Sequence, residues 1–244
     1  MIHLIEPDWP APTHIRACCT TRMGGVSQGY FSSFNLATHV EDERLHVEQN
    51  RSILKLQLKL NDEPAWLNQT HSTFAVNLDK EISRDADAAI TSTPGCVAVV
   101  LTADCLPVLF TDLEGSVVAV AHAGWRGLLN GVIEATIGKI NRPPQQLLCW
   151  LGPAISQKNF EVGEEVKQAF ADQQIDSQKH FLPGRKGHFQ ADLYELARDR
   201  LKQQQITRIY GGDYCSYGHE SLFFSYRRSK KCGRMASMIW IDLT

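Results

Sequence analysis

The feature that most constrains the fold is a pair of long apolar segments near the middle of the chain, followed by a tight turn. Residues 96–102 and 106–111 are almost continuously apolar, and a turn at residues 113–115 leads into the apolar residues 116–121. An apolar run of this length indicates a strand that is buried on both faces. The short turn predicts that the last two segments pair as an antiparallel hairpin.

Other segments extend this pattern into a mixed fold. Five more apolar or β-prone segments are expected as strands, namely residues 15–20, 147–151, 206–210, 222–225 and 236–241. Four segments with helical spacing are expected as helices, namely residues 43–58, 128–140, 162–171 and 192–204. Asp192 is placed to cap the last helix, with Glu195 three residues further on. Strands outnumber helices and do not alternate with them, which predicts a single α+β domain over residues 1–244, with mixed β-sheets packed with helices.

Composition limits the partners and the compartment. The net charge is −2, which gives no basic field for a nucleic acid. No apolar run approaches the ~20 residues of a membrane span, and the first seven residues lack a signal-peptide pattern. Seven scattered cysteines without a C-x-x-C pair favour reduced thiols and exclude a zinc ribbon. We therefore expect a cytoplasmic protein with no nucleic-acid or membrane partner.

The predicted hairpin brings a cysteine and a histidine together. Cys105 precedes the first hairpin strand and His122 follows the second, at nearly equal distances from the turn at Glu114. Two kinds of chemistry suit this pair. Cys105 is a candidate nucleophile with His122 as its base; alternatively, both bind zinc together with a third ligand, for which His71 is the candidate. Copper would also accept two imidazoles and a thiolate.

Three arginines stand in sequences that suit an anion. Arg22 lies beside a pair of glycines, Arg126 lies between Gly124 and Gly127 before an expected helix, and Arg228 follows an aromatic segment. Glycines expose backbone N–H groups, and arginine binds phosphate with two parallel hydrogen bonds. Trp125 is a candidate to stack on an aromatic ring or to line the wall of a pocket.

Eight short motifs occur in a specific order along the chain. They are Thr21-Arg22-x-Gly24-Gly25-Val26-Ser27, Asn35-Leu36, Gln69-x-His71, Thr102-Ala103-Asp104-Cys105-Leu106-Pro107-Val108-Leu109-Phe110, His122-Ala123-Gly124-Trp125-Arg126-Gly127, Leu151-Gly152-Pro153-Ala154-Ile155, Phe160-Glu161-Val162-Gly163 and Phe224-Ser225-Tyr226-Arg227-Arg228. Over essentially the whole chain they resemble the laccase-domain family, also called YfiH-like or polyphenol-oxidase-like proteins.

This resemblance implies a fold, a metal and an activity. The fold is a single α+β domain like the α/β sandwich of a cysteine hydrolase, and zinc is bound at the positions that match His71, Cys105 and His122. The activity is phosphorolysis of adenosine, inosine and methylthioadenosine, with adenosine deamination at the same site. Older assignments in the family are a copper-dependent polyphenol oxidase and a cysteine hydrolase. Bacterial members are also given a role in proofreading peptidoglycan precursors. Ser72 departs from the family, which commonly has glycine after the histidine.

The histidine content argues against a multicopper oxidase. The chain has nine histidines, and only two lie in the matching motifs. A single site with two histidines and one cysteine does not build a trinuclear copper cluster, although copper at a thiolate site would oxidise phenols weakly.

The leading hypothesis is therefore a zinc-containing purine nucleoside phosphorylase with a side adenosine deaminase activity, acting as a monomer or homodimer. Phosphate would be held by one of the three arginines, and zinc or its bound water would polarise the purine. Asp104 is the candidate proton carrier and Glu161 is a second candidate. Asn35 and Trp125 are further candidates for substrate binding.

Two rival hypotheses remain. One is a cysteine hydrolase that uses Cys105 and His122, and the other is a zinc-stabilised binding module without catalytic activity. In each enzymatic reading, Cys105 is expected to be the only functionally sensitive cysteine, because Cys18, Cys19, Cys96 and Cys149 lie in strand-like apolar segments.

Overall fold

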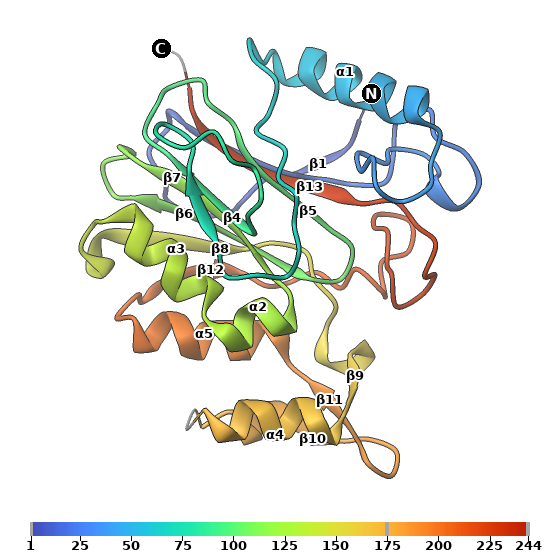
Figure 1. Cartoon of the computed structure of the whole chain (residues 1–244), viewed down its shortest axis with the longest axis vertical. Helices are drawn as coiled ribbons and strands as arrows, with labels where there is room; N and C mark the ends of the chain where they lie inside the picture. The colour runs from blue at the N-terminus through green and yellow to red at the C-terminus, as the bar shows by residue number, and fades with distance from the viewer. Residues whose placement is uncertain (1, 174–175, 243–244) are drawn as a thin grey trace.

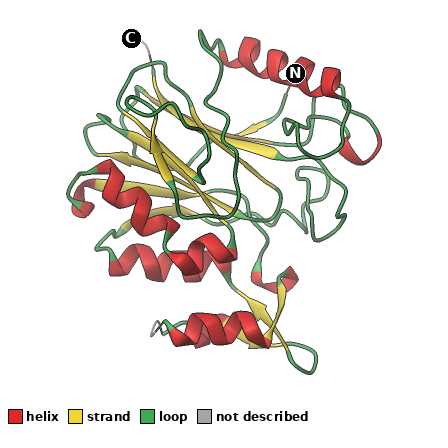
Figure 2. Cartoon of the chain, viewed as in Figure 1, coloured by secondary structure: helices red, strands yellow, loops and turns green. Residues whose placement is uncertain are grey.

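Two β-sheets packed face to face form the centre of the protein (Figures 1 and 2). The computed structural model describes residues 2–173 and 176–242. The first sheet has the order β1 (Leu4–Ile5), β2 (Ile15–Thr20), β13 (Met235–Ile241), β5 (Ala98–Thr102). The second has the order β12 (Arg208–Gly211), β8 (Leu147–Leu151), β6 (Leu106–Asp112), β7 (Val118–Ala123), β4 (Ala88–Thr91), β3 (Ala75–Asn77). Buried apolar side chains from both sheets, such as Val100, Leu109, Val120 and Ile239, fill the space between them.

Helices cover the outer face of each sheet. On the six-stranded sheet lie α2 (Trp125–Asn130), α3 (Val132–Ile140) and α5 (Leu193–Gln203), and on the four-stranded sheet lies α1 (Arg44–Leu58) (Figure 1). This order of helix, sheet, sheet and helix confirms the predicted α+β class. Asp192 caps α5 as expected, because its Oδ1 accepts a hydrogen bond of 3.1 Å from the backbone N–H of Glu195.

A smaller unit projects beyond the helices of the six-stranded sheet (Figure 1). It contains β9 (Glu161–Gly163), α4 (Glu164–Asp172), β10 (Phe181–Pro183) and β11 (His188–Ala191), and its three strands pair in the order β10-β11-β9. Short 3₁₀ segments at Gly29–Phe31, Pro144–Gln146, Gln157–Asn159 and Gln178–His180 complete the described elements.

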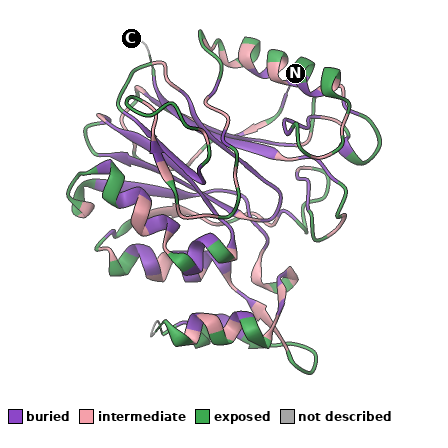
Figure 3. Ribbon diagram, in the orientation of Figure 1, coloured by how far each residue is buried: buried purple, intermediate pink, exposed green. Residues whose placement is uncertain are grey.

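The predicted hairpin is confirmed and determines where the candidate residues meet. Strands β6 and β7 pair antiparallel with Pro107 opposite His122 and Leu106 opposite Ala123. Cys105 is the residue directly before β6, so it lies at the open end of the hairpin, beside the end of β7. Every residue of both strands is buried, in agreement with an apolar run covered on both faces (Figure 3).

Several predicted elements were wrong in kind or in extent. Residues 222–225 form a turn and loop instead of a strand. The apolar pattern there reflects the burial of Phe223 and Phe224 in the core and does not indicate a sheet. The helix expected at residues 128–140 is interrupted at Gly131, whose φ of 99° ends α2 and begins α3. The helix expected at residues 162–171 begins only at Glu164, because β9 occupies the residues before it.

The cysteines behave as unpaired thiols. All seven are free, and Cys18, Cys19 and Cys149 are buried in the core. Burial raises the pKa of each of these three thiols, and that of Cys19 reaches about 12. They are therefore small, protonated packing residues. In the described residues, no helix is long and apolar enough to cross a membrane.

Candidate metal centre

Three side chains from separate segments converge at the open end of the β6–β7 hairpin. His71 comes from the loop before β3, Cys105 directly precedes β6 and His122 lies near the end of β7. Their ligating atoms all lie within 4.8 Å of one another, and His71 Nε2 is 3.7 Å from Cys105 Sγ. The structure therefore brings together the three residues that the sequence singled out as metal ligands.

A buried carboxylate that the sequence analysis missed positions both histidines. Asp87 lies directly before β4, and its Oδ1 accepts hydrogen bonds from His122 Nδ1 (2.8 Å) and from the backbone N–H of His71 (3.0 Å). When Nδ1 of His122 donates to Asp87, Nε2 remains as a free ligand atom. Metal-bound histidines in proteins commonly have such a carboxylate behind them.

The same carboxylate holds the loop that carries His71. Its Oδ2 accepts hydrogen bonds from the backbone N–H of Thr70 and Ser72 and from the hydroxyl of Ser72 (3.1, 2.6 and 2.7 Å). His71 itself has a φ of 61°, a conformation that non-glycine residues adopt only when the surroundings enforce it. We call this set of hydrogen bonds from His122 and residues 70–72 to the Asp87 carboxylate the clamp, and Ser72 completes it through its hydroxyl. The only sequence signal for Asp87 is an acidic residue directly before the apolar residues 88–90.

Gly124 leaves room beside the three ligands. A Cβ atom at this position would lie 2.9 Å from Cys105 Sγ and 3.0 Å from His71 Cδ2. Any other residue would displace a ligand, so glycine is required here for close approach of the backbone. Trp125 and Arg126 follow directly and begin α2 at the edge of the centre.

The pKa values of the centre describe a thiolate beside a protonated imidazole, and a bound metal cation would replace the proton on His122. Burial raises the pKa of Cys105, but the nearby His122 and His71 lower it to about 6. Burial lowers the pKa of His122, but the Cys105 thiolate and Asp87 raise it to about 9. Two imidazoles and a thiolate are ligands that zinc prefers, and three protein ligands leave a fourth position for water or substrate. The donor set, the clamp behind it and the space at Gly124 therefore fit a single zinc ion.

Asp104 has contacts that differ from those expected of a free proton carrier. Its φ is 86° and its side chain is buried. The carboxylate accepts hydrogen bonds from Ser216 Oγ (2.6 Å), Ser225 Oγ (3.0 Å) and the backbone N–H of Arg227 (2.6 Å). These contacts attach the loop of residues 213–228 to the chain directly before Cys105. Its role as a proton carrier stays a prediction.

Two of the predicted substrate ligands are occupied by contacts within the chain. Asn35 is fully buried, and its amide bonds to Ala37, Asp42 and the backbone N–H of Arg234. The guanidinium of Arg228 donates to three backbone carbonyls, those of Ser216, Tyr217 and Phe223. Both residues therefore hold loops in place, and neither presents an unoccupied side chain to a ligand.

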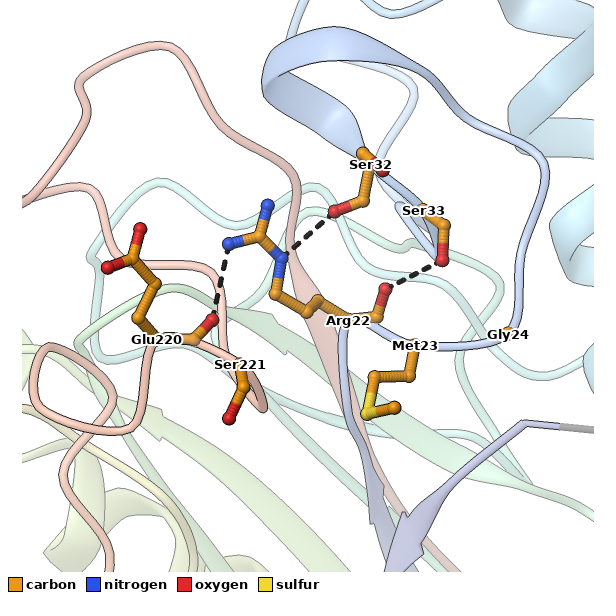
Figure 4. A pocket seen from close by; sticks show the side chains of 7 residues that line it. All are labelled: Arg22, Met23, Gly24, Ser32, Ser33, Glu220 and Ser221. Atoms are coloured by element: carbon orange, nitrogen blue, oxygen red, sulfur yellow. Dashed lines mark hydrogen bonds between the residues drawn. The ribbon is translucent and has the colours of Figure 1, made fainter.

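The other predicted ligands remain accessible. Arg126 is exposed, and its guanidinium lies 4.3 Å from the ring centre of the half-buried Trp125. Arg22 lines a pocket of about 440 Å³ with Ser32, Ser33, Glu220 and Ser221 (Figure 4). Glu161, the second candidate proton carrier, forms an ion pair of 2.9 Å with Arg185 in the projecting unit.

The clamp gives a first testable prediction. We expect Asp87→Asn to weaken zinc affinity by roughly 10- to 100-fold. The substitution replaces one acceptor oxygen by an NH₂ group, which cannot accept hydrogen bonds from the N–H groups around it and so no longer holds the histidines. Competition with a chromogenic chelator measures the affinity. Asp85→Asn is the matched control, since Asp85 is exposed two residues earlier and its carboxylate accepts a hydrogen bond from Asn68 Nδ2. Equal zinc affinity in the two variants would contradict the positioning role.

The fold and this centre define a mixed α+β protein with one candidate single-metal site. The model of the family described as multi-copper polyphenol oxidoreductase laccase matches residues 16–242, and the chain belongs to this family. In residues 2–173 and 176–242, His71, Cys105 and His122 are the one group of three such side chains close enough to share an ion. That is too few ligands for the several copper ions in the family's description.

Relatives of known name and structure extend over the whole chain. The "purine nucleoside phosphorylase PA4543" of Pseudomonas aeruginosa is 47% identical over 239 residues, 98% of each chain. The "purine nucleoside phosphorylase YfiH" of Escherichia coli is also 47% identical, over 99% of this chain and all of that protein. The crystal structure of Neisseria meningitidis protein NMB0706, of family DUF152, has a TM-score of 0.94 at 46% identity and covers 98% of this chain and 99% of that chain.

Proposed function

We propose that this chain is a purine nucleoside phosphorylase with zinc bound by His71, Cys105 and His122. The observation that carries the proposal is the convergence of these three ligands, within 4.8 Å of one another, in a chain 47% identical to relatives bearing that name. The substrates proposed are adenosine, inosine and methylthioadenosine, together with inorganic phosphate. Adenosine deamination is proposed as a side activity of the same centre.

Phosphorolysis sets clear requirements for the site. A phosphate oxygen forms a bond to C1′ of the ribose while the bond from C1′ to the purine nitrogen breaks, and the electron pair goes to the purine. When bound, zinc supplies a Lewis acid for the developing charge or activates a water for deamination. Asp87 orients His122 and His71 for this ligand set. Gly124 keeps the space beside Cys105 open, and an accessible arginine holds the phosphate anion.

A second candidate function has its own supporting observation. The thiol of Cys105 has a pKa of about 6 and lies 3.7 Å from His71 Nε2, which are the properties of an activated nucleophile. A cysteine hydrolase acting on an amide, including a peptidoglycan precursor, is therefore the alternative. Such an enzyme works without metal and is blocked by alkylation of the thiol.

One experiment separates these candidates. We expect the purified protein to release hypoxanthine from inosine only when phosphate is present, and a strong chelator to abolish the release. The measurement is base release by liquid chromatography, with and without phosphate and chelator, followed by restoration with zinc. Metal-independent turnover of an amide, with no phosphate-dependent base release, would favour the hydrolase. An absence of turnover on both substrates would favour a zinc-stabilised binding module.

A further inference from the structure

The loop that carries His71 is tied to the four-stranded sheet by the side chain of Gln69. The Nε2 of Gln69 donates a hydrogen bond of 2.8 Å to the backbone carbonyl of Leu101, and its Oε1 accepts one of 2.7 Å from the backbone N–H of the same residue. Leu101 lies in β5, an edge strand of that sheet, so the carboxamide takes the place of a neighbouring strand at this residue. We call this pair of hydrogen bonds the amide bridge.

The amide bridge joins the chain segments of two metal ligands. Gln69 lies two residues before His71, and Leu101 lies four residues before Cys105. The end of β5 is itself fixed, because Thr102 is buried and pairs with β13. The bridge therefore relates the position of His71 to that of Cys105 over a short path of ordered residues.

The backbone of His71 needs anchors on both sides. Its φ of 61° is a conformation that persists only when the surrounding structure enforces it. The clamp holds residues 70–72 from the side of the six-stranded sheet, because Asp87 directly precedes β4. The amide bridge holds the start of the loop from the other sheet. His71 is thus held between the two sheets, and loss of either anchor lets its backbone relax.

The distance between the two ligand atoms is the one that a single ion requires. In a tetrahedral zinc site, bonds of about 2.0–2.1 Å to nitrogen and about 2.3 Å to sulfur place these two atoms roughly 3.6 Å apart. His71 Nε2 lies 3.7 Å from Cys105 Sγ. The fold therefore holds this pair of atoms at the separation of two ligands of one zinc ion, and the amide bridge is the direct link between their segments.

We propose that Gln69 is a positioning residue of the metal centre, which keeps His71 at ligand distance from Cys105 through the amide bridge. The inference rests on the zinc centre of the proposed function. Both polar atoms of the carboxamide are used in the bridge. Gln69 therefore acts through His71 and does not itself bind the ion or a substrate.

Two substitutions test the bridge. Gln69→Met keeps the length of the side chain without its hydrogen bonds, and Gln69→Asn keeps the carboxamide on a side chain that is too short to reach Leu101. We expect each to weaken zinc affinity roughly tenfold, the usual effect of losing a group that orients a metal ligand. Competition with a chromogenic chelator measures the affinity, and thermal unfolding shows that each variant is folded.

Gln57→Met is the matched control. The carboxamide of Gln57, on α1, forms the same kind of two-bond bridge, with the backbone N–H and carbonyl of Ile2 at 2.9 and 3.1 Å. This bridge lies on the outer side of the four-stranded sheet and holds none of the three ligands. We expect the control to lose a similar amount of thermal stability and to keep the wild-type zinc affinity.

Alkylation of Cys105 gives a second readout, which a general loss of stability does not change in the folded protein. A thiolate bound to zinc is protected from alkylation, because the metal occupies the sulfur lone pair that would attack. With one zinc ion per chain, we expect iodoacetamide to modify Cys105 severalfold faster in both Gln69 variants than in the wild type and in Gln57→Met. Peptide mass spectrometry identifies the modified cysteine.

The outcomes separate this role from the proposed activity. Wild-type zinc affinity and wild-type protection of Cys105 in both Gln69 variants would overturn the positioning role. Wild-type behaviour of Gln69→Met alone would overturn it too, since the side chain would then act by packing and not through the amide bridge. If base release never requires phosphate, the phosphorylase activity fails while the zinc measurements still decide the role of Gln69. A wild-type chain that binds no zinc overturns the metal centre and this role together.

Discussion

Cys105→Ala is expected to abolish zinc binding and phosphate-dependent base release while leaving the protein folded. The thiolate is the only anionic ligand among the three converging side chains, and removal of one of three protein ligands leaves two histidines that do not retain the ion. The fold does not depend on the metal, because the two sheets and their covering helices bury extensive apolar cores. Metal content per chain, turnover and thermal unfolding are the three measurements.

Cys96→Ala is the matched control for this variant. Cys96 is partly buried near the start of β5, away from the three ligands, and burial raises the pKa of its thiol. We expect this variant to keep the wild-type zinc content and turnover. Full turnover of Cys105→Ala would overturn the zinc enzyme and the cysteine hydrolase together, since both need this sulfur atom.

The metal ligands were predictable from sequence because they depend on one local pairing. The apolar segments before and after residues 113–115 force a buried hairpin, and the hairpin register places Cys105 beside His122. His71 was named as the third ligand from its residue type and from the family resemblance, since no local pattern connects its loop to the hairpin. The fold class also followed from the pattern, because long buried strands are strong signals.

What the sequence did not reveal are contacts made by polar side chains across the fold. Asp87 lies 35 residues from His122 and 16 from His71, and nothing in its local sequence indicates that its carboxylate holds both. Asn35 and Arg228 stand in distinctive motifs that indicated ligand binding. In the structure, their side chains form hydrogen bonds with the backbone and hold loops in place. A distinctive polar residue is thus required for chemistry or for loop geometry, and the sequence alone does not separate the two.

The loop of residues 213–228 shows how much the site depends on such contacts. Arg228 donates to the carbonyls of Ser216 and Tyr217 within this loop, and Asp104 receives the hydroxyls of Ser216 and Ser225 from the same loop. No regular strand or helix supports the segment over residues 216–228. Burial of Phe223 and Phe224 in the core holds part of this segment. One buried carboxylate and one guanidinium supply the side-chain hydrogen bonds that hold Ser216, Tyr217 and Ser225.

Removal of that carboxylate gives the second large prediction. We expect Asp104→Ala to lower the free energy of unfolding by roughly 3–5 kcal/mol, because two buried hydroxyls and the N–H of Arg227 lose their acceptor, at about 1–3 kcal/mol for each orphaned group. Urea denaturation followed by tryptophan fluorescence measures this change. Turnover at a temperature where the variant is folded should fall as well, because the loop beside Cys105 is released.

Asp104→Asn distinguishes the loop anchor from the proton carrier. Asparagine keeps one acceptor oxygen but has no proton to exchange, so as an anchor it retains part of the stability and part of the turnover. The double variant Ser216→Ala with Ser225→Ala leaves the carboxylate intact and removes two of the loop's bonds to it. If Asp104 acts as an anchor, turnover in all three variants falls in parallel with loop stability, and the pH profile keeps its shape. If Asp104 carries the proton, Asp104→Asn loses far more turnover than its partial loss of stability explains, and the serine variant stays active.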